Sequence, residues 1–293
     1  MDGIYWTRGA HKRVLAGYRK YLATSAVSLG KVRIPTRFGE TGVLTCGPTQ
    51  APTLLLLHGG NINSAMWLSS LPAWSKRFRV YAVDTIGDPG FSATTRPSFH
   101  TDDHARWLSD VLKALNVERT NIVGASLGGW IGLDFALRYP SAVDRLVLFA
   151  PAGITRIPVA TTLGISGLML LGAWGRRRAL LRGFSLVTAR LTDDQRAFLD
   201  FCSITQLNAL SRIRLPAPIV DERLKTLSAP TLVVLGGRDI FFNSELVHRR
   251  FHALCPTATV QVVPEAGHIA VNAKEMVQDF LAEKLCSHQT VST

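Results

Sequence analysis

One serine of this chain stands in a sequence context that could make it a nucleophile. Residues 124–128 read Gly-Ala-Ser-Leu-Gly, which matches the pattern Gly-x-Ser-x-Gly with Ser126 at its centre. The pattern carries chemistry when a strand precedes it and a helix follows it, because the sharp turn then holds the serine hydroxyl out at the edge of a sheet. An apolar run, 121–123, and a helix-like run, 127–139, supply this context. Ser126 is therefore the predicted catalytic nucleophile, and a glycine-rich turn needed only for packing is the alternative.

A serine hydroxyl is a weak nucleophile near neutral pH and needs a base, for which the chain offers eight histidines. His268 follows the apolar run 259–263 and precedes the last predicted helix. A loop at the carboxyl end of a parallel strand is where such sheets place their sites, so His268 is the predicted general base. His58 also follows an apolar run, but the two glycines after it predict that this histidine orders its own loop.

The third group of such a site is an acid that fixes the tautomer of the base and stabilises the imidazolium. Asp239 sits in a turn shortly after the apolar run 231–235. It gives the chain order Ser126, Asp239, His268, which is the order expected when the nucleophile lies on this kind of turn. Asp84 is the rival acid, but it precedes the nucleophile, so we expect it to stabilise the turns that follow it by hydrogen bonding.

The tetrahedral intermediate of acyl transfer needs backbone N–H groups aimed at its oxyanion. The residue after the nucleophile, Leu127, supplies one donor. The loop after the apolar run 53–57 supplies the other, and it reads His-Gly-Gly-Asn at residues 58–61. Glycine lets backbone approach a substrate closely, so the N–H of Gly60 is the preferred candidate and that of Asn61 is the second.

Apolar runs alternate with helix-like runs along most of the chain. Predicted strands lie at 32–38, 43–46, 53–57, 80–83, 121–123, 146–149, 231–235 and 259–263. Predicted helices lie at 101–115, 127–139, 244–254 and 270–285. Strands that alternate with helices indicate a parallel sheet with right-handed crossovers and helices on both faces. The predicted fold class is therefore α/β, with a mostly parallel, doubly wound sheet whose carboxyl edge carries the residues above.

The alternation stops after Pro151 and resumes near residue 224. Residues 152–223 show helical segments without a convincing strand, which predicts an all-helical cap inserted between the two halves of the sheet. The predicted division is an N-terminal helical extension at 1–31, laid on the body or on a partner, a core at 32–151 and 224–293, and the cap at 152–223. Five large apolar residues of the cap are expected either to shape an apolar pocket or to pack between cap helices: Leu168, Met169, Leu170, Leu171 and Trp174.

The chain carries 33 basic and 21 acidic residues, a net charge of +12. One basic cluster runs from Lys12 to Arg37, and a second comprises Arg176, Arg177, Arg178 and Arg182. No nucleic-acid-binding motif accompanies them, so no nucleic-acid partner is expected and a solvated basic face is the main interpretation. Two alternatives stay open. The second cluster attracts anionic substrates to the site, or it binds anionic lipid together with the N-terminal helix, although a membrane surface is not the expected partner.

The remaining sequence features limit which cofactors or metals the protein could use and where in the cell it is expected. Four widely spaced cysteines, without Cys-x-x-Cys or zinc-ligand spacing, are expected to be free thiols: Cys46, Cys202, Cys255 and Cys286. No phosphate-binding loop or dinucleotide fingerprint is present, so neither a cofactor nor a metal is expected. The first residues do not resemble a signal peptide, and the most apolar segment, 163–174, is shorter than the roughly 20 residues that span a bilayer. We therefore expect a cytoplasmic protein, either a monomer or a homo-oligomer.

Taken together, these motifs make the chain resemble the α/β-hydrolase superfamily, in its serine hydrolase branch, over residues 32–286. The resemblance rests on Leu57-His58-Gly59-Gly60, Asp84, the motif around Ser126, Gly237-Arg238-Asp239 and Gly267-His268. Within the superfamily, Met66-Trp67 and residues 81–88 are similar to bacterial carboxylesterases that include naproxen-ester hydrolases. The resemblance implies the α/β-hydrolase fold, a Ser-Asp-His triad and a covalent acyl-enzyme.

The sequence thus predicts a carboxylic-ester hydrolase that acts on small, apolar esters. A carbon–carbon bond hydrolase of the ring-fission-product type would use the same catalytic residues, so it is the first alternative. A hydrolase-fold receptor that binds a small molecule and releases it unchanged is the second alternative, although a pure binder has no need of an intact triad.

Overall fold

A single sheet forms the centre of the molecule. The computed structural model describes residues 3–183, 191–210, 215–268 and 273–287. Within them, eight strands join in the order β1-β2-β4-β3-β5-β6-β7-β8. Their bounds are β1 Gly30–Thr36, β2 Gly39–Cys46, β3 Thr53–Leu57, β4 Arg79–Val83, β5 Thr120–Ala125, β6 Val143–Phe149, β7 Thr231–Gly236 and β8 Ala258–Val263. The pairs from β4 to β8 are parallel, whereas β1–β2 and β2–β4 are antiparallel, so the predicted mostly parallel sheet is confirmed.

Both faces of the sheet are covered by helices, as a doubly wound fold requires. The helices that follow the strands are α2 Leu71–Trp74, α3 Asp103–Ala114, α4 Leu127–Arg138, α9 Ser244–Leu254 and α10 Lys274–Ser287. Within β3, Leu55 and Leu57 pack in one core cluster with residues of α3, α4 and α9. Leu54 and Leu56 point to the opposite face and pack in a second cluster with residues of α2 and α10. A strand buried on both sides reads as an unbroken apolar run, which is why this strand was recognisable from its sequence.

The second strand begins earlier than predicted. The predicted strands at 32–38 and 43–46 leave residues 39–42 as a turn, but β2 begins at Gly39. The hairpin closes through Arg37 and Phe38, because Thr36 pairs with Gly39. Glycine at 39 has a φ of 112°, which permits so tight a reversal. The error arose because residues 39–42 read Gly-Glu-Thr-Gly, which carries no apolar periodicity.

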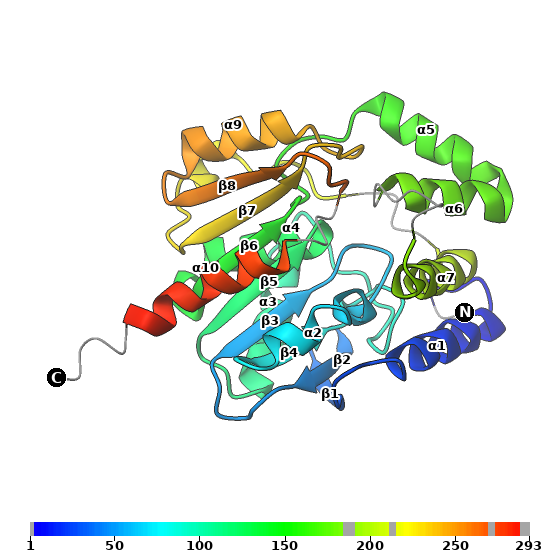
Figure 1. Cartoon of the computed structure of the whole chain (residues 1–293), viewed down its shortest axis with the longest axis horizontal. Helices are drawn as coiled ribbons and strands as arrows, with labels where there is room; N and C mark the ends of the chain where they lie inside the picture. The colour runs from blue at the N-terminus through cyan, green and yellow to red at the C-terminus, as the bar shows by residue number, and fades with distance from the viewer. Residues whose placement is uncertain (1–2, 184–190, 211–214, 269–272, 288–293) are drawn as a thin grey trace.

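Helices occupy the described chain between β6 and β7. They are α5 Val159–Leu170, α6 Gly172–Gly183, α7 Asp193–Asn208 and the single turn α8 Asp221–Leu224. Figure 1 shows α5, α6 and α7 gathered on the side to which the strand arrows point. The described residues of this segment form no strand beyond one isolated bridge between Tyr5 and Ala209. The division of the chain into a core and a cap stays a prediction.

The N-terminal helix α1, Arg8–Leu22, lies on the body of the protein. The hydroxyl of Thr7 caps its first turn by accepting a hydrogen bond from the N–H of Ala10 at 3.0 Å. Its buried face packs on α7, where the ring of Tyr21 stacks on that of Phe201 with 5.2 Å between ring centres. Figure 1 shows α1 and α7 side by side. Of the two placements left open by the sequence, the structure therefore shows the one on the body.

Candidate active site

Ser126 occupies the turn between β5 and α4. Its φ of 51° and ψ of −111° lie in a region that non-glycine residues rarely adopt. Such strain persists only where the surroundings hold the backbone firmly. The N–H of Ser126 donates to the carbonyl of Phe149 at 2.8 Å, and its own carbonyl accepts from the N–H groups of Trp130 and Ala152, both at 3.0 Å. These three hydrogen bonds fix the serine between β5, the start of α4 and the loop after β6.

The two glycines of the motif allow the close packing on which this turn depends. A methyl group on Gly128 would lie 2.3 Å from the carbonyl oxygen of Leu57, at the end of β3. A methyl group on Gly124 would lie 2.5 Å from the carbonyl oxygen of Gly128. Both distances are far shorter than a non-bonded contact between carbon and oxygen. In both cases the oxygen belongs to the backbone, which cannot move out of the way as a side chain could. The first turn of α4 can therefore approach the sheet only when both positions lack a side chain.

Asp239 and His268 form a hydrogen-bonded pair. Asp239 lies in the loop after β7, and His268 lies in the loop after β8. The Nδ1 atom of His268 and the Oδ2 atom of Asp239 are 2.8 Å apart. Only 1% of the Asp239 side chain and 12% of the His268 side chain are exposed. This pairing places the imidazole proton on Nδ1 and leaves Nε2 as the proton-accepting atom, which is what a general base requires.

The other carboxylate oxygen of Asp239 is also held in place. Oδ1 accepts hydrogen bonds from the backbone N–H groups of Phe241 at 2.7 Å and Phe242 at 3.2 Å. The two phenyl rings flank the imidazole of His268, with ring centres 4.7 and 5.4 Å away. Sequence reasoning missed these aromatic neighbours, although their position two and three residues after Asp239 was a usable signal.

The three predicted triad residues lie at one edge of the sheet. They follow β5, β7 and β8, which are parallel, so the carboxyl ends of the three strands point the same way. The structure brings Asp239 and His268 into contact. Among the described residues, the Ser126 hydroxyl makes no hydrogen bond with His268. Hydrogen bonds between catalytic groups are often long before substrate binds. The missing contact therefore does not argue against Ser126 as the nucleophile, and that role stays a prediction.

The loop after β3 packs against the start of α4. A methyl group on Gly59 would lie 3.7 Å from the Cβ atom of Ser126, and one on Gly60 would lie 3.4 Å from the Cδ2 atom of Leu127. Asn61 adopts the left-handed conformation, with a φ of 63°. Backbone of this loop therefore lies beside the nucleophile, as an oxyanion donor must. Gly60 and Asn61 both remain candidates for the second donor beside Leu127.

His58 ties the loop after β3 to the loop after β4. Its Nε2 atom accepts a hydrogen bond from the N–H of Thr85 at 2.8 Å, and its Nδ1 atom lies 2.7 Å from the carbonyl of Gly59. The side chain is buried, and both ring nitrogens are used by backbone. These contacts order the loop and leave no ring nitrogen for substrate, in agreement with the structural role that the sequence suggested.

Asp84 anchors three separate segments. Its Oδ1 atom accepts from the Tyr18 hydroxyl and from the N–H of Ser64, both at 2.9 Å. Its Oδ2 atom accepts from the N–H of Phe91 at 2.7 Å. The aspartate is 1% exposed and holds α1, the 3-10 turn after β3 and the loop after β4 together. The structure thus places Asp84 in a supporting position, as expected, and adds a partner, Tyr18, that the sequence did not suggest.

Tyr18 is fully buried beside that carboxylate. Burial raises its pKa well above the ordinary value, and the negative charge of Asp84 raises it further. Its ring stacks on Phe91, with ring centres 4.4 Å apart. The sequence predicted a helix in this region, but apolar periodicity carries no information about where a hydroxyl will find its acceptor.

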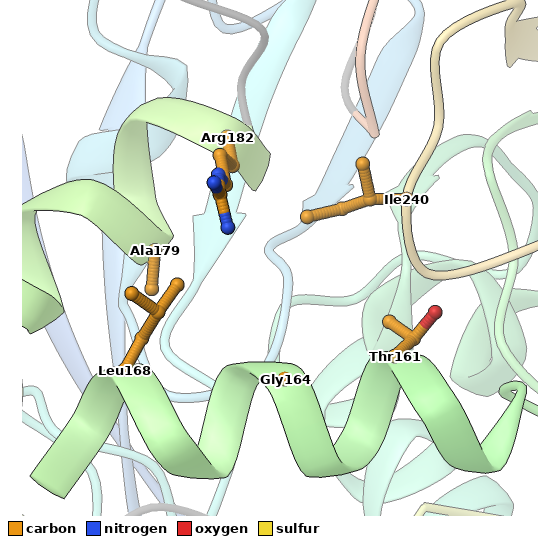
Figure 2. Close-up of a pocket in the computed structure, with 6 residues that line it drawn as sticks. All are labelled: Thr161, Gly164, Leu168, Ala179, Arg182 and Ile240. Carbon is orange, nitrogen blue, oxygen red and sulfur yellow. The ribbon is translucent and has the colours of Figure 1, made fainter.

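A cavity of about 260 Å³ lies between α5, α6 and the loop after β7. Six residues line it: Thr161, Gly164, Leu168, Ala179, Arg182 and Ile240. Figure 2 shows the side chains of Leu168, Arg182 and Ile240 around the same space. Ile240 directly follows Asp239 in the chain. The cavity therefore adjoins the loop that carries the predicted acid, and it combines apolar walls with one cationic group.

The expectation for the large apolar residues of the cap is correct only in part. Leu168 lines the cavity. Leu170, Leu171 and Trp174 neither line it nor pack between helices, because 88%, 58% and 60% of these side chains are exposed. They lie where α5 ends and α6 begins, around a reversal at Gly172. The side chain of Met169 lies outside the described residues.

The second basic cluster is divided among different environments. Arg177 forms an ion pair with Asp200 at 3.1 Å, and the guanidinium of Arg178 lies 5.4 Å from the centre of the Trp174 ring. Arg182 lines the cavity. A uniformly solvated face does not describe this arrangement, since one arginine reaches the cavity beside the predicted site.

The described residues include no group of three or more histidine, cysteine or acidic side chains arranged to hold a metal ion. No helix among them is long and apolar enough to cross a membrane.

Three cysteines are buried free thiols, namely Cys46, Cys202 and Cys255. Burial raises the pKa of Cys255 to about 11. The side chain of Cys286 lies outside the described residues.

A mostly parallel sheet with a Gly-x-Ser-x-Gly turn at its carboxyl edge is the architecture of the serine hydrolases of α/β type. The chain belongs to the α/β hydrolase fold family, because the model of that family matches residues 52–218. Carboxylesterase YbfK of Bacillus subtilis is 30% identical over 94% of this chain and 94% of its own length.

Two further relatives show how far the likeness extends. The crystal structure of naproxen esterase (carboxylesterase NP) from Bacillus subtilis superposes with a TM-score of 0.83 and 27% identity, covering 94% of this chain and 99% of that chain. The 2-hydroxy-6-oxononadienedioate/2-hydroxy-6-oxononatrienedioate hydrolase of Paraburkholderia xenovorans is 27% identical over 79% of this chain and 87% of its own length. The predicted resemblance to the superfamily and to bacterial carboxylesterases of the naproxen-ester type is thus confirmed.

Proposed function

We propose that this protein hydrolyses carboxylic esters through Ser126, His268 and Asp239. The Oγ atom of Ser126 attacks the ester carbonyl carbon while its proton passes to Nε2 of His268. Asp239 holds the imidazole in the required tautomer and stabilises the imidazolium that forms. The N–H groups of Leu127 and Gly60 donate to the oxyanion, each lowering the barrier by about 3 kcal/mol if they act as measured in other serine hydrolases.

The second half of the reaction uses the same groups. His268 gives its proton to the departing alcohol, which leaves an acyl group on Ser126. A water molecule then attacks the acyl carbon while His268 takes its proton, and the acid departs as Ser126 recovers its hydrogen. Each step moves one proton and requires no further group, so no cofactor enters the scheme.

The observation that carries this proposal is the Asp239–His268 pair at the same edge of the sheet as a serine in a strained turn. The 2.8 Å contact and the burial of the aspartate match the orienting half of a triad. Strained backbone costs about 1–3 kcal/mol and is concentrated at functional sites, so the φ of 51° at Ser126 supports a catalytic role. Relatives named as carboxylesterases support ester hydrolysis as the reaction.

The cavity beside Ile240 suggests the kind of ester. Its walls are largely apolar, and about 260 Å³ accommodates a small acyl or alcohol group rather than a long lipid chain. We propose that residues 152–223 act as a cap that shapes this cavity, with Leu168 on the apolar wall. Arg182 in the cavity wall would favour substrates that carry an anionic group.

The proposal is tested with p-nitrophenyl esters of increasing acyl length and with a fluorophosphonate probe that labels activated serines. We expect turnover that falls as acyl chains outgrow the cavity, and covalent labelling that Ser126→Ala abolishes. Ser228→Ala is the matched control, because Ser228 is exposed in a loop and should leave both readouts unchanged. Absence of turnover across the panel, or undiminished labelling of Ser126→Ala, would sink the proposal.

A carbon–carbon bond hydrolase is the second candidate, favoured by the similarity to the Paraburkholderia xenovorans enzyme and by Arg182 in the cavity. Turnover of a vinylogous diketone acid together with inert esters would establish it. A non-catalytic receptor would bind such compounds without turnover and without labelling at Ser126.

A further inference from the structure

The turn between α5 and α6 carries a group of exposed apolar side chains, here called the hairpin tip. Its members are Leu170, Leu171 and Trp174, whose side chains are 88%, 58% and 60% exposed; Leu163, 67% exposed, lies seven residues before Leu170 on α5. Figure 1 shows this turn at the outer edge of the molecule, away from the sheet. Single exposed apolar residues are ordinary, but three large ones within five residues at one turn indicate an interaction surface.

The hairpin tip adjoins a row of cations. Trp174, Arg178 and Arg182 are spaced four residues apart on α6, so they lie on one face of the helix. The guanidinium of Arg178 lies 5.4 Å from the centre of the Trp174 ring. Arg178 forms no ion pair with a described residue, whereas Arg182 lines the cavity. The charge of Arg178 is therefore available to an anionic partner.

A lipid surface with anionic headgroups satisfies both features at once. Leucine and tryptophan side chains enter the boundary between headgroups and acyl chains, while arginines beside them remain at the level of the phosphates. Tryptophan is favoured there because its ring is apolar and its N–H is polar. We propose that the hairpin tip docks this protein on an anionic lipid surface, with Arg178 contacting the headgroups.

A second copy of the chain fits this surface less well. Two copies that met through their hairpin tips would bring together the Arg178 side chains that lie over the Trp174 rings, and each chain already carries a net charge of +12. Like charges brought together across an interface oppose association. The positive charge of the chain and of Arg178 therefore favours docking on a negatively charged surface over self-association.

Vesicle co-sedimentation tests the proposal. The full-length protein is mixed with vesicles of phosphatidylcholine alone, or of phosphatidylcholine with about 30% phosphatidylglycerol, and the bound fraction is measured. We expect binding to the anionic vesicles only, weakened by raised salt because part of the attraction is electrostatic. The double variant Leu170→Ser/Leu171→Ser should lower the partition coefficient about 100-fold, since each leucine contributes about tenfold when it is buried.

Arg178→Gln should lower the partition coefficient about fivefold, because one cation close to an anionic bilayer contributes a factor of that size. The matched controls lie on α9: Leu246→Ser removes an exposed leucine and Arg249→Gln removes an exposed arginine. Both controls should bind vesicles as the unaltered protein does. Because the replaced side chains are exposed, thermal unfolding and hydrolysis of a short p-nitrophenyl ester should not change in any of these variants.

Three outcomes would overturn the proposal. The first is failure of the unaltered protein to bind anionic vesicles at low salt. The second is binding that the tip variants and the α9 controls reduce equally, which would assign it to overall charge. The third is a dimer in solution that dissociates in the Leu170→Ser/Leu171→Ser variant, which would assign the hairpin tip to a second copy of the chain. Ester hydrolysis is measured separately, so its failure would leave these results interpretable.

Discussion

Replacing Tyr18 with phenylalanine removes one oxygen atom from a fully buried position. That oxygen donates a 2.9 Å hydrogen bond to the carboxylate of Asp84. A hydrogen bond to a charged group contributes about 1.5–3 kcal/mol. The same oxygen of Asp84 keeps the N–H of Ser64 as a donor, and its partner oxygen keeps the N–H of Phe91. The loss should therefore fall near the middle of that range, about 2 kcal/mol in the free energy of unfolding at pH 7.5.

The pH dependence of this difference provides a second, independent readout. Burial and the charge of Asp84 raise the pKa of Tyr18 in the folded state. The unfolded chain has an ordinary tyrosine pKa of about 10, so it loses this proton first as the pH rises. The unaltered protein thus keeps the full contribution of Tyr18 below pH 10 and loses it above. At pH 11 the advantage over Tyr18→Phe should have shrunk by about 1.4 kcal/mol.

Urea unfolding followed by tryptophan fluorescence measures both quantities at pH 7.5 and pH 11. Tyr139→Phe serves as the control, because the Tyr139 hydroxyl forms no hydrogen bond with a described residue. Its effect should stay within about 0.5 kcal/mol at either pH. A Tyr18→Phe variant as stable as the control would refute the reasoning. So would a stability difference that grows rather than shrinks between the two pH values.

Four further substitutions test the site and its support. Asp239→Asn should lower kcat about 10⁴-fold while leaving the fold intact, since an amide stabilises the wrong imidazole tautomer; steady-state kinetics and circular dichroism report the two effects. Gly128→Ala should destabilise by more than about 3 kcal/mol or prevent folding, because its methyl group would lie 2.3 Å from the carbonyl oxygen of Leu57. Gly167→Ala, where a methyl group meets nothing within 4 Å, should instead stabilise by about 0.5–1 kcal/mol in thermal unfolding. Asp134→Ala, which leaves two partly exposed arginines without their buried acceptor, should cost about 2 kcal/mol in the same measurement.

The sheet and the placement of the candidate triad were predictable because parallel strands impose strong constraints on sequence. A strand buried on both faces must be apolar throughout, and residues 54–57 are four consecutive leucines. The carboxyl ends of such strands meet at one edge, so Ser126, Asp239 and His268 could be grouped from their positions alone. The tight turn at Ser126 further requires small neighbours, which left a visible signature in Gly124 and Gly128.

The helices between β6 and β7 were less predictable, because an apolar segment does not specify what will cover it. Leu168 and Leu170 are two residues apart in the same run, yet one lines the cavity and the other is 88% exposed. The difference depends on where the chain reverses at Gly172 and on how α6 then packs against α5. Those are tertiary facts, and the local pattern of leucine and glycine is compatible with either side facing inward.

The partner of Tyr18 was unpredictable for a related reason, and it changes the role of the N-terminal helix. From sequence, residues 1–31 were an extension to the core. In the structure, the Tyr18 hydroxyl donates to Asp84, which also accepts from the N–H of Ser64. Ser64 follows shortly after residues 58–61, the loop that carries the candidate oxyanion donors. The loop is fixed at a second point, because Nε2 of His58 accepts a hydrogen bond from the N–H of Thr85, the residue after Asp84. Helix α1 is therefore part of the support of the site, and its loss should loosen the loop on which oxyanion stabilisation depends.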